Sequence, residues 1–260
     1  MIRMLKRQIR STLKPVSAIA DRVRRPPDGL TVLIYHRVGA GSSSEVDLDP
    51  ARFRAQMQEL ASSGRAVSLD DGLAFLAGSD IGIERPVAVT FDDGTPDVVE
   101  HALPVLDELA IPMTLYLATR YVDEAIPFWE DDDPVLTWSA LSDAMASSLL
   151  TIGSHTHSHA LLDRLEPHRI DDELDASIRL IEDHLGVTPT HFAYPKALPP
   201  NEAAAIAVRA RFSSAALAGT RANPVGTDPF VLARSPIQRS DRMRWFRHKM
   251  DGGLGFEDRV

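Results

Sequence analysis

Three histidines fall within five positions of this 260-residue chain, in the run Gly153-Ser-His-Thr-His-Ser-His159. Imidazole nitrogens are common ligands of divalent metals, and residues spaced i and i+4 face the same way on a helical turn. Alternate residues of a strand also converge, so His157 competes with His155 and His159 for a ligand position. The chain contains no Cys, so any metal must be held by His and carboxylates.

Two adjacent carboxylates, Asp92 and Asp93, lie in a second run, Thr-Phe-Asp-Asp-Gly at residues 90–94. Burying both is costly unless a cation neutralises one of them, although an Asp-Gly pair also forms simple turns that cap helices. Together with two of the histidines, the pair describes a His₂Asp metal site with one carboxylate left as a general base. This combination predicts metal-assisted hydrolysis.

Strand-like and helix-like runs alternate from residue 29 onward. Seven apolar runs predict strands at residues 31–35, 86–91, 113–118, 149–153, 191–194, 213–217 and 229–233. Helical patterns separate most of them, and a last helix begins at a Ser240 cap. The alternation predicts an α/β fold of βα units, closed as a barrel or open and doubly wound. Both polar runs follow predicted strands, where active sites of such folds collect.

Charge is unevenly distributed along the chain. The net charge is −9, but the first 25 residues carry +7 and the remainder −16. So acidic a body excludes nucleic acid as an expected partner, because binding there requires neutralised phosphates. No apolar run approaches the length of a membrane span, and the absence of Cys fits a cytoplasmic protein.

The sequence predicts three parts: a basic N-terminal arm over residues 1–26, a barrel over residues 27–240, and a C-terminal helix and tail over residues 241–260. Basic residues interrupt the arm throughout, unlike a secretory signal. Its apolar residues recur at spacings of three and four and form one helical stripe: Ile2, Leu5, Ile9, Leu13 and Val16. Such a helix could lie on an anionic membrane surface or pack on the body.

The sequence resembles the polysaccharide deacetylase family, which is carbohydrate esterase family four. Three stretches carry the resemblance: residues 90–94, the His-x-x-x-His of residues 155–159, and Phe-Ala-Tyr-Pro at residues 192–195. Tyr35-His-Arg-Val38 is also similar to the first strand of a common subgroup. The resemblance covers roughly residues 30–240 and implies a distorted (β/α)₇ barrel. It further implies metal-dependent removal of acetyl groups from N-acetylated sugars, a hydrolysis of C–N bonds other than peptide bonds.

The resemblance also assigns roles by position. Asp92 would be the general base, while Asp93, His155 and His159 would hold one divalent ion. We expect zinc there, with cobalt, nickel or iron as alternatives. A backbone N–H near Lys196 would help to hold the oxyanion.

Several positions depart from the family pattern. After Phe-Ala-Tyr-Pro the family usually has a polar or aromatic residue and then Gly, whereas this chain has Lys196 and then Ala197. Ala takes up positive φ less freely than Gly. The arginine that some members carry corresponds to Ala193; Arg234 could supply a guanidinium instead, or be a surface residue. The family's late acid histidine has no match, which leaves His36 as the candidate general acid or as a core histidine.

Three aromatic residues, Trp129, Trp138 and Tyr194, could stack on sugar rings or pack in the core. The sequence thus predicts a cytoplasmic N-deacetylase of sugars or glycan precursors, with peripheral membrane contact through residues 1–25. One alternative is a non-catalytic carbohydrate-binding or scaffolding descendant of the fold. A second is a deacylase that acts on a non-sugar amide.

Overall fold

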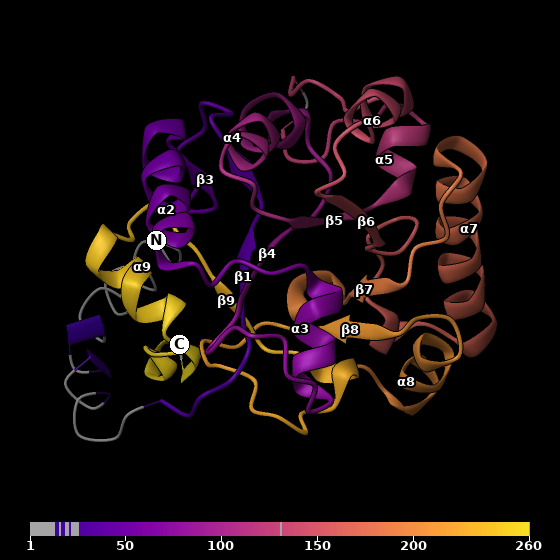
Figure 1. Cartoon of the computed structure of the whole chain (residues 1–260). Coiled ribbons are helices and arrows are strands. Elements are labelled where there is room, and N and C mark those ends of the chain that lie inside the picture. The colour runs from indigo at the N-terminus through magenta and orange to yellow at the C-terminus, as the bar shows by residue number, and fades with distance from the viewer. Residues whose placement is uncertain (1–13, 16, 19–20, 22–25, 131, 260) are drawn as a thin grey trace.

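A computed structural model describes residues 14–15, 17–18, 21, 26–130 and 132–259. Over these residues, seven parallel strands form a nearly closed barrel surrounded by helices (Figure 1). The strands are β1 (Thr31–Tyr35), β4 (Val87–Phe91), β5 (Met113–Leu117), β6 (Leu150–Ser154), β7 (His191–Ala193), β8 (Ser214–Ala216) and β9 (Arg234–Pro236). The predicted α/β fold and its distorted (β/α)₇ barrel are therefore confirmed.

The order of the strands around the ring follows the chain. It runs β8-β7-β6-β5-β4-β1-β9, and every pair is parallel. The ring is joined between its end strands by Leu232, just before β9. Leu232 N donates to Ala215 O at 3.1 Å, and Leu217 N donates to Leu232 O at 2.8 Å. A short parallel pair, β2 (Arg37–Val38) with β3 (Asp47–Leu48), follows β1.

The helices are α2 (Pro50–Ser63), α3 (Leu69–Leu76), α4 (Leu103–Glu108), α5 (Thr119–Asp123), α6 (Trp138–Ala144), α7 (Pro167–Leu185), α8 (Glu202–Arg209) and α9 (Met243–Met250). Local sequence explains the ends of the longer ones. The Asp49 side chain caps α2 by accepting from Arg52 N, and Gly64 ends that helix in the left-handed region at φ 65°. Gly186 ends α7 in the same way at φ 69°.

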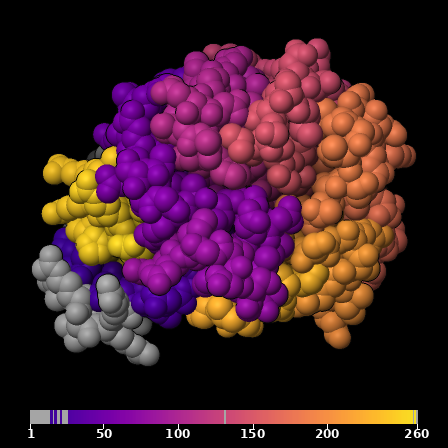
Figure 2. All heavy atoms as spheres, in the orientation of Figure 1, coloured from indigo at the N-terminus to yellow at the C-terminus, as the bar shows by residue number. Residues whose placement is uncertain are grey.

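The strands separate two apolar layers, because successive side chains point to opposite faces. Outside the barrel, Leu33, Phe91 and Leu115 pack against the surrounding helices. Inside it, Val32 and Ala88 lie in a smaller cluster that α3 closes with apolar residues of its own. Figure 1 shows α3 across the middle of the ring, and in Figure 2 the purple atoms of this part of the chain cover the centre of the same face.

Some predicted elements differ from the structure. The strand predicted at residues 229–233 is a 3₁₀ turn over Pro229–Val231, and β9 begins only at Arg234. Asp228 stabilises that turn by accepting from Phe230 N, and proline favours its first position. The last helix begins after Arg242 and not at Ser240. The sequence analysis also missed α3 and α5, which are both short.

The described residues near the N-terminus pack against the C-terminal segment. Lys14 forms a buried ion pair with Asp241, and Ala18 lies in an apolar cluster with Trp245 and Leu254. The apolar stripe at positions 2, 5, 9, 13 and 16 lies outside the described residues. No helix within the described ranges has both the length and the apolar character needed to cross a bilayer.

Candidate active site

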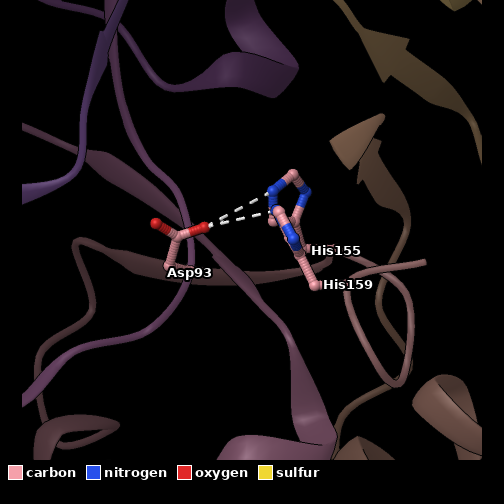
Figure 3. Close-up of side chains that lie close together, drawn as sticks. All are labelled: Asp93, His155 and His159. Atoms are coloured by element: carbon pink, nitrogen blue, oxygen red, sulfur yellow. Dashed lines mark ion pairs between the residues drawn. The ribbon is translucent and has the colours of Figure 1, made fainter. Parts of the chain in front are cut away.

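One aspartate and two histidines meet at the carboxyl ends of β4 and β6 (Figure 3). Asp93 Oδ1 lies 3.6 Å from Nε2 of His155 and 3.7 Å from Nε2 of His159. Metal–ligand bonds of about 2.0–2.2 Å at tetrahedral angles place neighbouring ligand atoms about 3.3–3.6 Å apart. The three side chains predicted as ligands are thus spaced to hold one divalent ion.

The backbone around these ligands is held in an unusual conformation. Asp93, Thr156 and His159 have φ of 77°, 65° and 59°, which lie in the left-handed region. That region costs a non-glycine residue about 1–2 kcal/mol. Strained residues of this kind cluster at functional sites, where the surrounding structure must hold them in place.

Hydrogen bonding selects the tautomer of His155. Its Nδ1 lies 2.7 Å from Ala193 O, so Nδ1 carries the proton and Nε2 keeps its lone pair toward Asp93. Burial also lowers the pKa of His155. Burial, together with the charge of His155, lowers the pKa of His159 to about 3. Both rings are therefore neutral near pH 7, as metal ligands must be.

The Asp93 carboxyl group is poorly satisfied by the protein alone. It is 3% exposed, and its Oδ2 is buried with no hydrogen-bond partner in the described part of the chain. Burial, followed by the charge of Asp92, raises its pKa well above the usual range. The charges of Arg234 and Arg37 oppose this shift without reversing it. A buried carboxyl group that faces two neutral imidazoles therefore fits a divalent cation.

Asp92 lies beside the ligand cluster but is held by Arg234. The guanidinium Nη1 and Nη2 donate to Asp92 Oδ1 and Oδ2 at 2.6 and 2.8 Å, a bidentate pair. Arg234 is fully buried and also donates through Nε to Leu217 O at 3.1 Å. The surface alternative for Arg234 is therefore wrong: its side chain crosses the barrel interior, and its contact is with Asp92.

The Arg234 pair keeps Asp92 ionised. Burial raises the pKa of Asp92, but the charges of Arg234 and His155 outweigh this and lower it to about 2. Asp92 Oδ2 lies 3.8 Å from His155 Nε2, at the edge of the ligand cluster. The two adjacent carboxyl groups thus have opposite pKa shifts, which is typical of paired groups with different roles.

His157 does not join this cluster. Its Nδ1 lies 3.1 Å from Thr119 Oγ1, and its carbonyl accepts from Arg120 N at 2.8 Å. The alternation that made His157 a competitor fails, because β6 ends at Ser154 and the chain turns at Thr156. The spacing of four residues therefore brings the two ligands together.

His36 follows β1 at the same end of the barrel. Burial lowers its pKa to about 4, while the charge of Asp92 opposes this shift. Its ring centroid lies 6.1 Å from that of Trp129, which is 38% exposed. Phe128, the residue before Trp129, meets the His159 ring edge-on at 5.1 Å. Two aromatic side chains thus border the site.

The other predicted substrate-binding residues lie in different surroundings. Lys196 is exposed, and both it and Ala197 have positive φ, 54° and 53°. Ala197 thus takes up the left-handed conformation despite its Cβ. Tyr194 is buried outside the barrel, where its ring meets Phe192 edge-on at 5.0 Å. Trp138 stacks on His184 away from the site, with ring centroids 4.5 Å apart.

Arg37 is a residue near the site that the sequence analysis missed. It is 3% exposed, and its Nη1 lies 2.9 Å from Asp133 Oδ2. Asp133 follows the aromatic residues Phe128 and Trp129 in the sequence. Its Nε lies 3.7 Å from Asp97 Oδ1, and Asp97 also accepts from Val38 N. The only available signal was its place in the run at residues 35–38, because its partners are 60 and 96 residues away.

Comparison with known proteins identifies the family. The polysaccharide deacetylase family model matches residues 81–214, which is just over half of the chain and includes Asp92, Asp93, His155 and His159. The chain belongs to the polysaccharide deacetylase family. The resemblance seen in the sequence motifs is therefore confirmed, and His36 and Arg234 lie outside the matched range.

Individual relatives in this family agree with that assignment. YxkH of Bacillus subtilis strain 168, which carries the name of a polysaccharide deacetylase, is 26% identical to this chain over 170 residues. The match spans 65% of this chain and 57% of YxkH. The structure of IcaB from Ammonifex degensii is similar with a TM-score of 0.73 and 27% identity, covering 86% of this chain and 97% of IcaB.

A third relative is similar in fold alone. The Streptococcus pyogenes deacetylase PplD, solved in complex with acetate, matches with a TM-score of 0.74 at 19% identity. The match covers 86% of this chain and 99% of PplD. The barrel described above is thus shared with IcaB and PplD over nearly the whole length of each.

Proposed function

We propose that this chain is a metal-dependent N-deacetylase of sugars or glycan precursors. The observation that carries the proposal is the arrangement of two adjacent carboxyl groups. Asp93 faces His155 and His159, whereas Asp92 is left beside them in a bidentate pair with Arg234. This arrangement supports one carboxylate as a ligand and one as a base, which metal-assisted hydrolysis requires.

Zinc is the proposed ion at Asp93, His155 and His159, with cobalt, nickel or iron as alternatives of similar ligand preference. When bound, such an ion supplies Lewis-acid polarisation of the acetyl carbonyl and lowers the pKa of a neighbouring water. Asp92 takes the proton from the attacking water, and its pair with Arg234 fixes the orientation of the carboxylate. The backbone N–H of Lys196 donates to the oxyanion, since Pro195 has no N–H and the Ala197 N–H is bonded to Tyr194 O.

The departing amine must gain a proton, and His36 is the proposed donor. A pKa of about 4 leaves its ring neutral near pH 7, so in this proposal it receives a proton during turnover and passes it on. Asp92, which has just taken up the proton of the water, is the nearby source. The exposed face of Trp129 beside His36 is proposed to contact the sugar.

Acetate release from N-acetylated sugars tests the proposal directly. Chelator treatment should abolish the release, and Zn²⁺, Co²⁺ or Ni²⁺ should restore it. Asp92→Asn should lower kcat about 10²–10⁴-fold, because a positioned base is lost. The exposed α7 variant Asp172→Asn is the matched control and should leave kcat unchanged.

Two other outcomes would contradict this proposal. Metal-loaded protein that stays inert on a broad panel of N-acetylated sugars, yet binds glycans equally well with and without Asp92→Asn, would indicate the carbohydrate-binding alternative. Release of acetate only from amides that are not sugars would indicate the deacylase alternative.

The cytoplasmic location and the membrane contact of residues 1–25 belong to the same proposal. Lys14, within that segment, is buried against Asp241, so at least part of the segment contacts the body. Deleting residues 1–13 should abolish sedimentation with anionic vesicles and leave acetate release intact. Equal sedimentation of both proteins would contradict the membrane contact.

A further inference from the structure

The turn that carries the two histidine ligands needs support from outside itself. Thr156 and His159 both have positive φ, so the turn holds two non-glycine residues in a conformation that they rarely adopt. One bond lies within the turn, where Thr156 Oγ1 accepts from Ala160 N at 3.0 Å. Further support comes from α5, where Arg120 N donates to His157 O at 2.8 Å, and from α7, which packs against this end of β6.

Glu173 of α7 contacts the turn through both oxygens of its carboxylate. Its Oε2 accepts from Ser158 N at 2.8 Å, and its Oε1 accepts from Ser158 Oγ at 2.6 Å. Both oxygens of one carboxylate are thus used on a single residue of the turn. Ser158 is the residue directly before the ligand His159, so these bonds hold the His157–Ser158 peptide group and the Ser158 side chain next to that ligand.

The position of Glu173 on its helix is unusual. It is 8% exposed and lies on the buried face of α7, next to Leu174 and one turn from Ile170. A carboxylate on such a face is costly unless it is fully hydrogen-bonded. One turn further along, Ser177 Oγ lies 2.8 Å from Ser154 Oγ, at the end of β6. Helix α7 thus contacts the strand end and the turn through one row of polar residues.

We propose that Glu173 is a positioning residue that holds His159 in its metal-binding orientation through Ser158. With Ser158 fixed, His157 turns toward Thr119 and His159 turns toward Asp93. Glu173 touches neither the ion nor the substrate. The inference rests on the proposed function, because it assumes that His159 is a ligand.

The expected effect is on metal affinity. Partners that orient metal ligands without touching the ion typically change affinity about 10–100-fold when they are removed. Glu173→Ala should therefore weaken Co²⁺ binding by about that factor and lower kcat more than it raises KM. Glu173→Gln should restore most of the affinity, because its amide oxygen can accept from Ser158 N while its NH₂ donates to Ser158 Oγ.

The experiment is a Co²⁺ titration of the full chain, followed by the visible absorption of the bound ion and by competition with a chelator. Glu182→Ala is the matched control, since Glu182 lies exposed on the same helix and accepts from Thr188 Oγ1 at 2.6 Å, away from the turn. Ser158→Ala, which removes one of the two bonds without changing α7, provides a second test if Glu173→Ala does not fold.

Weaker Co²⁺ binding by Glu173→Ala and Ser158→Ala, with unchanged binding by Glu182→Ala, supports the proposal. Equal affinities in all three variants overturn it. A wild-type chain that binds Co²⁺ while Glu173→Ala binds it equally well overturns this inference alone. A wild-type chain that binds no Co²⁺ overturns the proposed function together with it.

Discussion

The two ends of the barrel each contain a buried histidine aligned by a bond to Nδ1, but their surroundings differ. At the carboxyl end, His155 Nδ1 bonds to Ala193 O at 2.7 Å. At the amino end, His191 Nδ1 lies 2.9 Å from Ser214 Oγ. The Nε2 atom of each ring faces a carboxylate, Asp93 at 3.6 Å in one case and Asp70 at 3.3 Å in the other.

Exposure of the carboxylate separates the two ends. The Asp70 side chain on α3 is 71% exposed, so water screens its charge. Asp92 and Asp93 are each 3% exposed, and their charges must be balanced by neighbours. At the carboxyl end a second histidine, His159, also faces Asp93, and among the described residues Asp70 has no such second histidine. Similar residue types thus form a helix-to-strand contact at one end and the candidate metal site at the other.

The largest expected effect is on the buried pair that distinguishes the carboxyl end. Arg234→Met leaves the Asp92 carboxylate buried without its partner, so the free energy of unfolding should fall by about 3–5 kcal/mol. Urea-induced unfolding measures this loss. The double variant Asp92→Asn, Arg234→Met should recover part of it.

The control for that variant is Arg211→Met. Arg211 pairs with Asp171 and Asp175 at the partly exposed surface of α7, and its loss should cost no more than about 1 kcal/mol. Equal decreases in the free energy of unfolding for Arg234→Met and Arg211→Met would contradict the prediction that the buried pair contributes more to stability.

A smaller effect, stabilisation by added metal, should distinguish the carboxyl end of the barrel from the amino end. Zn²⁺ at 100 times its Kd should raise the free energy of unfolding by about 2.7 kcal/mol, because the ion binds only the folded protein. His159→Ala should abolish this stabilisation, whereas His191→Gln should keep it. Thermal unfolding with and without Zn²⁺ measures both. Loss of the shift in His191→Gln would contradict the division between the two ends.

The smallest effect is the pH dependence of the amino end. Burial lowers the pKa of His191, although Asp70 opposes the shift, so the folded protein keeps this ring neutral where the unfolded chain binds a proton. The free energy of unfolding should therefore fall as the pH drops below about 6.5, by up to about 1.4 kcal/mol per pH unit for this one group.

His191→Gln should remove the part of the pH dependence of the unfolding free energy that comes from His191. Other buried histidines contribute in the same direction, so the slope should decrease without disappearing. Denaturation of the metal-free protein at pH 7.5, 6.5 and 5.5 gives the slope. The exposed His168→Gln is the control and should leave it unchanged. A slope unaltered by His191→Gln would contradict the prediction.

The sequence was sufficient for the elements whose signals are local. The apolar runs indicated most of the barrel strands, and Asp49-Pro50 and Gly64 marked the ends of α2. It failed where local signals compete, as at residues 229–233, where strand propensity and a proline turn overlap. It also missed α3, whose eight residues are too few for a clear periodicity.

The candidate site shows the same division. Asp93, His155 and His159 could be proposed as neighbours, because residues that follow parallel strands meet at one end of a barrel. Residue spacing alone left His157 open, and the family resemblance assigned His159. The turn at Thr156, which no local pattern predicts, gives the physical reason. The Asp92 contact of Arg234 was invisible, since 142 residues separate the two.

The sequence by itself determined the residue types, their order on the strands and the chemistry that they allow, because these follow from composition and short-range periodicity. Only the tertiary structure decided which groups are buried together. Burial raises the pKa of both Asp92 and Asp93, and the charge of Arg234 helps to reverse the shift for Asp92. Helix α7 brings Glu173 to the turn before His159. Charges and hydrogen bonds act through space over a few ångströms, so distance along the chain carries no information about them.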